Sequence, residues 1–157
     1  MTFKNLQDDL IAEVEGILSE IQTKNTAGEK VVGVKGYAHQ LPVMETDEED
    51  VSQLMPYFIV RFEGGETKED NDPWHISTQI LFSVHDESKS NGHEHLLTMI
   101  QRVVDRFVSE PLLNKMYRAD QDIQFAIADD DTYPFYFGGI SIKFSIPKIG
   151  RREPDYV

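Results

Sequence analysis

The sequence predicts an α+β domain in which two helices cover one face of a mainly antiparallel sheet of about four to five strands. The first observation is the alternation from Trp74 to Val84, where an apolar side chain at every second residue indicates a strand with one buried face. The second is the three- and four-residue spacing of apolar side chains in Leu6–Ile21 and Leu96–Phe107, which is typical of amphipathic helices. Packing both helical stripes on the apolar face of the sheet would bury all three surfaces.

The other expected elements follow in chain order. Asn25 to Gly28 end the first helix, and Asn91 and Glu94 suit the start of the second. The expected segments are a weak strand at Val31–Tyr37 interrupted by Gly33 and Gly36, a strand at Pro56–Phe62 that pairs with the strand from Trp74, a turn at His85–Gly92, a short helical or irregular turn at Pro111–Tyr117, and a hairpin of Ile123–Ile127 with Tyr136–Ile146.

The length of 157 residues suits a single domain. Within it we expect an acidic loop at 44–55, a mobile hairpin loop at 63–73 and a C-terminal tail at 147–157. The absence of cysteine excludes disulfides, thiolate metal sites and a cysteine nucleophile. Because there is no secretory leader and no apolar run long enough to cross a bilayer, we expect a soluble, cytoplasmic protein.

The chain is strongly acidic, with a net charge of −13. Between Met44 and Asp72, ten acidic residues stand against Arg61 and Lys68, a local balance of −8. Such a surface repels nucleic-acid phosphates and anionic membranes. We therefore expect neither as a specific partner.

The residue types that carry chemistry do not form a persuasive site. His93, Glu94 and His95 lie near His85 and Asp86, but residues two apart on a helix point in different directions and share an ion poorly. Asp129 to Asp131 could bind a cation with Asp70 or Asp72, yet a solvated turn explains them better. A nucleophile elbow, a phosphate loop and a dinucleotide fingerprint are missing, and Gly138-Gly139 indicates a bulge or a close backbone approach. We expect no enzyme, cofactor or metal.

Aromatic side chains suggest contacts instead. The run Tyr133 to Phe137 cannot place every ring on one face of a strand, so some rings should lie outside, either under the helix ends or at a subunit interface. Arg151 and Arg152 are opposite in sign to the acidic region, which makes a head-to-tail contact between copies conceivable.

Several segments resemble the tail-completion, or tail-terminator, proteins of long-tailed bacteriophages and prophages. The likeness runs from about Leu6 to Arg152 in order and spacing. It is carried by Pro56–Gly65 (PYFIVRFEGG), the strand Ile76–Val84, the helix start Gly92–Leu97 (GHEHLL) and Tyr133–Gly139 (YPFYFGG).

The resemblance implies a subunit of a ring, typically hexameric, that caps the tail tube, ends its polymerisation and forms the tail side of the head–tail joint. Its partners would be further copies of itself, the tail-tube protein and a neck or head-completion protein, with DNA passing through the ring. It would reside in the host cytoplasm during assembly and then in the virion tail. The alternatives are a neck or head-closure adaptor, and an acidic binding module that mimics nucleic acid.

The candidate contact residues combine the acidic region, the aromatic side chains and the basic C-terminal segment. They are assigned to subunit interfaces or to the ring lumen. They are Glu48, Glu49, Asp50, Glu66, Lys68, Glu69, Asp70, Trp74, Tyr133, Phe135, Arg151 and Arg152.

Overall fold

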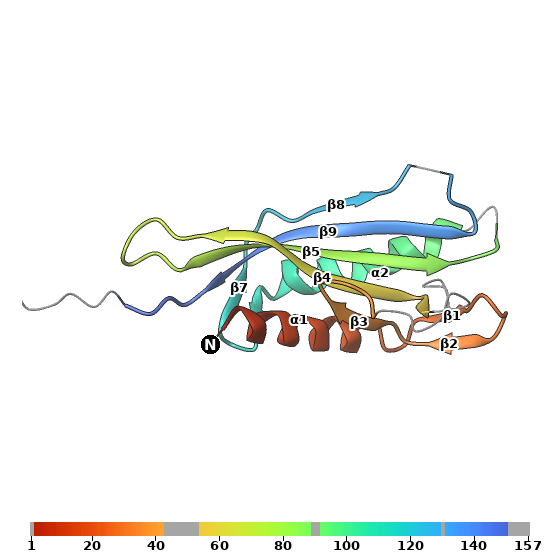
Figure 1. Ribbon diagram of the computed structural model, residues 1–157, viewed down its shortest axis with the longest axis horizontal. Coiled ribbons are helices and arrows are strands. Elements are labelled where there is room, and N and C mark those ends of the chain that lie inside the picture. The colour runs from red at the N-terminus through yellow and green to blue at the C-terminus, as the bar shows by residue number, and fades with distance from the viewer. Residues whose placement is uncertain (1, 43–53, 89–91, 130, 151–157) are drawn as a thin grey trace, which may run out of the picture.

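The fold was taken from a computed structural model that describes residues 2–42, 54–88, 92–129 and 131–150 (Figure 1). Two helices and nine strands follow one another along the chain. They are α1 (Phe3–Ile17), β1 (Gln22–Lys24), β2 (Lys30–Val32), β3 (Lys35–Ala38), β4 (Tyr57–Glu66), β5 (Trp74–His85), α2 (Gly92–Ser109), β6 (Leu112–Leu113), β7 (Tyr117–Ala119), β8 (Gln124–Ile127) and β9 (Phe135–Ile146).

Seven strands form one strongly curled, mainly antiparallel sheet. Their order is β3-β4-β5-β9-β7-β6, and β8 pairs with β9 beside β7. Only β3 and β4 run parallel within this sheet, while β1 and β2 make a separate two-stranded hairpin. The α+β class is confirmed, but the expected four to five strands were too few.

The missed strands are short. Residues 31–37 contain two strands rather than one, because Gly33 adopts a positive φ of 85° between β2 and β3. The predicted turn at Pro111–Tyr117 instead holds β6 and the start of β7, which have two and three residues. Alternation cannot be recognised over so few residues.

Both helices pack against the same core as the sheet (Figure 1). Helix α1 buries Leu6, Leu10 and Val14 fully, and α2 contributes Leu96, Met99 and Val103. The predicted first helix was too long, because α1 ends at Ile17 and Leu18 is its C-cap. Leu18 and Ile21 are nonetheless buried, so the apolar spacing continued beyond the helix into the turn that leads to β1.

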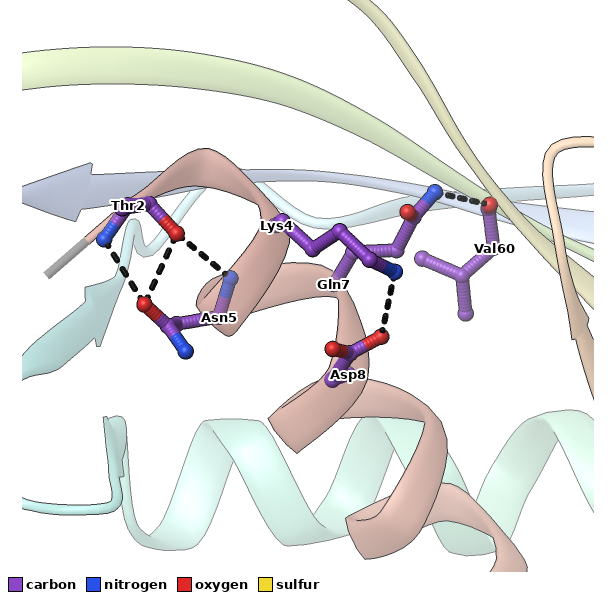
Figure 2. Close-up of polar contacts among 6 residues, drawn as sticks. All are labelled: Thr2, Lys4, Asn5, Gln7, Asp8 and Val60. Atoms are coloured by element: carbon purple, nitrogen blue, oxygen red, sulfur yellow. Dashed lines mark hydrogen bonds and ion pairs between the residues drawn. The ribbon is translucent and has the colours of Figure 1, made fainter.

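Polar contacts fix the start of α1 (Figure 2). The Thr2 hydroxyl accepts a hydrogen bond from the Asn5 backbone at 3.1 Å, and Asn5 Oδ1 accepts one from the Thr2 backbone at 3.1 Å. This reciprocal pair satisfies amides that the first helical turn leaves free. Buried Gln7 then donates from Nε2 to the Val60 carbonyl at 3.0 Å, which joins α1 to β4. Residues around Asn91, the expected cap of α2, lie outside the described ranges.

Strands β4 and β5 form a long hairpin that extends beyond the helices at one end of the molecule (Figure 1). The expected loop at 63–73 is shorter in the structure, because β4 continues to Glu66 after a register shift between Phe62 and Gly64. The Lys148 ammonium donates to the Thr67 hydroxyl at 2.9 Å and to the Glu69 carbonyl. The segment after β9 therefore braces the end of the hairpin.

Gly36 allows β3 to lie directly over the core. A Cβ at this position would lie 2.3 Å from the Phe58 ring and 2.9 Å from Ile11 Cγ2. Because Phe58 is fully buried, Gly36→Ala is expected to lower the free energy of unfolding by about 1–3 kcal/mol, measured by urea denaturation. Gly16→Ala is the matched control, since nothing lies within 4 Å of that Cβ and alanine favours a helix by up to about 1 kcal/mol. Equal stability of Gly36→Ala and the wild type would contradict the packing described here.

Candidate assembly surfaces

The tip of the β4–β5 hairpin carries four of the predicted contact residues. Glu66, Lys68, Glu69 and Asp70 are all exposed there. Trp74, at the base of the tip, is half-buried because its ring packs edge-on against Phe3 at 5.5 Å. The tip therefore presents a polar, mainly acidic surface, and the tryptophan ties that surface to the start of α1.

The aromatic run forms a second surface. Tyr133 is 41% exposed, and its hydroxyl donates to the Glu87 carbonyl at 2.6 Å. Phe135 is half-buried, with its ring 5.5 Å from the ring of buried His85. The expectation that some rings lie outside thus holds for Tyr133, whereas Phe135, Tyr136 and Phe137 are half-buried.

These two surfaces lie at opposite ends of β5. Trp74 pairs with Ile146 at one end of the strand, and His85 pairs with Phe135 at the other. Twelve residues of continuous ladder separate them, so the hairpin tip and the aromatic run cannot belong to a single contact patch. Glu48, Glu49, Asp50, Arg151 and Arg152 lie outside the described residues.

The histidines near the start of α2 have different partners. The His93 ring contacts Tyr136 at 4.6 Å, while His95 Nε2 lies 3.7 Å from the Asp86 carboxylate. Burial, followed by the Asp86 charge, raises the pKa of the Tyr136 hydroxyl. Within the described ranges, no group of three or more histidine and acidic side chains is placed to hold a metal ion.

The two aspartate clusters are also far apart. Asp129 and Asp131 lie in the connection from β8 to β9, which leads to the residue that pairs with His85, while Asp70 and Asp72 lie in the loop before Trp74. A shared cation site formed by these residues is therefore excluded by their positions in the sheet.

A polar hollow of about 520 Å³ lies between the β1–β2 hairpin and the end of β5. Thr23 Oγ1 and His85 Nδ1 are buried at its lining without a hydrogen-bond partner. The other polar side chains of the wall include two lysines and two carboxylates, and they are Gln22, Lys24, Asn25, Lys30, Asp86, Glu87, Ser88 and His95. Because cationic and anionic side chains both line the hollow, its charge favours neither an anionic nor a cationic ligand.

Sequence reasoning missed an apolar groove of about 550 Å³ on the sheet, lined by β4, β5, β8 and β9. Ile59, Leu81, Phe125 and Phe137 contribute to its walls. Its signal in the sequence was Gly138-Gly139, because a Cβ on Gly139 would lie 2.9 Å from Leu81 Cδ2 on the groove wall and 3.2 Å from the Ile80 carbonyl. Of the two explanations expected for these glycines, close backbone approach fits, since the β5–β9 register runs through them without a shift.

No family model matches this chain, and no curated protein gives a significant match. In the part of the chain that the structure describes, no helix is long and apolar enough to cross a membrane.

The described residues therefore offer three surfaces suited to contacts. They are the acidic hairpin tip at one end of β5, the exposed Tyr133 at the other end, and the apolar groove beside β8. These surfaces can bind other molecules through charged, aromatic and apolar contacts.

Proposed function

We propose that this protein is a structural subunit of a bacteriophage or prophage tail. Copies of it form a ring on the end of the tail tube, stop tube polymerisation and present the tail side of the head–tail joint. The ring is hexameric, as in the family that the sequence resembles. The subunit works in the host cytoplasm during assembly and remains in the virion.

The separation of exposed surfaces along β5 carries this proposal. A joint subunit must contact the tube on one side and a neck protein on the other, and it must also contact its neighbours in the ring. The hairpin tip and the Tyr133 surface lie at opposite ends of the long β5 ladder. The resemblance in Pro56–Gly65 and Tyr133–Gly139 falls on the strands that lead to these two surfaces.

The acidic hairpin tip also suits a ring through which DNA passes. Glu66, Glu69 and Asp70 would repel DNA phosphates if the tip faced the lumen, and DNA would then not adhere during passage. Cross-linking of these residues to DNA in assembled tails would support this placement. Cross-links only to the outer rim would rule it out.

Removing the tip charges is expected to weaken binding to tail tubes. The variant Lys68→Ala/Glu69→Ala/Asp70→Ala should bind purified tubes at least about tenfold less tightly in a co-sedimentation assay. A loss of about 1.4 kcal/mol of binding free energy at the contact raises the Kd by that factor. Its free energy of unfolding should change by at most about 0.5 kcal/mol per substitution, because all three side chains are exposed.

The chain offers a matched control of identical composition. Lys115→Ala/Asp105→Ala/Glu110→Ala removes the same charges from exposed positions on α2 and the turns beyond it. This control should bind tubes like the wild type. Binding of the wild type to filled heads but not to tubes would favour a neck or head-closure adaptor instead. If the tip variant binds tubes as tightly as the wild type, the hairpin tip is not part of the contact with the tube.

A further inference from the structure

Strand β8 is an open edge of the sheet. Among the residues that the structure describes it pairs only with β9, and Gln124, Phe125 and Ala126 are exposed. An exposed strand edge is a template for another strand. Phe125, which is 59% exposed, also lines the apolar groove.

The chain around β8 is rich in aspartate, and the exposed Lys143 of neighbouring β9 lines a hollow with Asp122 and Gln124. Between Arg118 and Lys143 the sequence has five aspartates and no lysine or arginine. Asp120 and Asp122 precede the strand, and Asp129 and Asp131 follow it. We call residues 120–129 together with Asp131 the β8 strip.

The β1–β2 hairpin has complementary properties. It does not join the main sheet, and Val32 on β2 is 60% exposed. From Gln22 to Ala38 there are three lysines against one acidic residue. Lys24 and Lys30 pair in register across the hairpin, and the described residues include no ion pair to either ammonium. A two-stranded hairpin is marginally stable alone, so it gains from added pairing.

The hairpin and the β8 strip lie on opposite sides of the molecule. Hairpin strand β2 is followed directly by β3, the edge strand at one end of the sheet, while β8 lies beyond β9 toward the other end (Figure 1). Two different, complementary surfaces on opposite sides of one chain give a head-to-tail contact, which generates rings when the rotation closes.

We propose that the β1–β2 hairpin of one subunit docks on the β8 strip of the next copy. Val32 packs beside the neighbour's exposed Phe125, and Lys24 and Lys30 lie among the neighbour's Asp122 and Asp129. This inference rests on the proposed ring function and names the contact between neighbouring subunits.

The charges also select against symmetric pairing. Two β8 strips placed face to face would bring two sets of aspartates together, and two hairpins would bring two sets of lysines together. Like-charge contacts of this kind are unfavourable and suppress the wrong arrangement. The head-to-tail contact is the one arrangement of these two surfaces that pairs opposite charges.

Engineered cysteines test the contact cleanly because the chain has none of its own. Val32→Cys protein mixed with Phe125→Cys protein should form a disulfide-linked dimer at high concentration under oxidising conditions, and each protein alone should give at least about tenfold less. The double variant Val32→Cys/Phe125→Cys should form a ladder or a closed cross-linked ring. Val108→Cys mixed with Phe125→Cys is the control, since Val108 is 65% exposed on α2 but outside both surfaces.

Charge reversal gives a second readout on the same cross-link. Lys24→Asp/Lys30→Asp in the Val32→Cys protein should reduce the yield of disulfide-linked mixed dimer at least about tenfold. Asp122→Lys/Asp129→Lys in the Phe125→Cys partner should restore that yield. A dimer formed by Phe125→Cys alone would overturn the proposal in favour of a symmetric contact. Mixed dimers no more abundant than those of the Val108→Cys control would also overturn it.

The proposed function and this contact fail separately. Normal capping of tubes without the cross-link would remove the contact and leave the function intact. If the cross-link forms but the protein does not cap tubes, the contact between copies stands and the proposed function is wrong.

Discussion

Replacing Phe144 with alanine is expected to lower the free energy of unfolding by about 3–5 kcal/mol. Phe144 is fully buried on β9, where it pairs with Ile76 of β5 and Ala119 of β7. Its ring meets Phe107 of α2 edge-on at a centroid distance of 5.4 Å. The substitution therefore opens a cavity where three strands and a helix meet. The loss should appear as a lower urea midpoint with an unchanged m value.

Phe125→Ala is the matched control for that prediction. It removes the same ring from a strand that also pairs with β9, but from an exposed position. Its free energy of unfolding should change by no more than about 1 kcal/mol, because little apolar area returns to water. Equal losses in the two variants would contradict the assignment of the core to the space between the sheet and α2.

The long elements could be predicted because their periodicity extends over many residues. On β5 the predicted apolar face, from Ile76 to Phe82, is buried at every second residue, and on β9 Ile140, Ile142, Phe144 and Ile146 are buried in the same way. The position of α2 was also readable, because its stripe contains buried Leu96, Ile100, Val103 and Phe107.

The rest depended on tertiary context. The parallel pairing of β3 with β4 links segments separated by about twenty residues. The sequence of neither strand indicates whether its partner runs parallel or antiparallel. The hydrogen bond from Gln7 to Val60 could not be predicted either, because a glutamine between charged positions of a helix is expected to be exposed. The end of α1 was misplaced because Leu18 and Ile21 keep a helical spacing after the helix has ended.

The candidate surfaces could be predicted only in part. The acidic composition of the hairpin tip was visible in the sequence, and the structure places Glu66, Lys68, Glu69 and Asp70 on its exposed end. The separation of Trp74 from Tyr133 required the register of β5 with β9. The apolar groove could not be predicted from any one segment, because its walls come from four strands that become neighbours only in the folded sheet.

Tail tubes assembled without this protein are expected to lose control of their length. A tube grows by repeated head-to-tail addition, and such an assembly continues until subunits run out or its end is blocked. A ring of this protein would block the end by occupying the contact that the next tube subunit needs. Without it, the length distribution should broaden and extend well beyond the length of complete tails.

Electron microscopy of tails assembled with and without this protein tests the central claim most directly. The proposal predicts uniform tubes with an additional ring at one end when the protein is present, and tubes of widely varying length without that ring when it is absent. Tubes of the same uniform length in both preparations would contradict it.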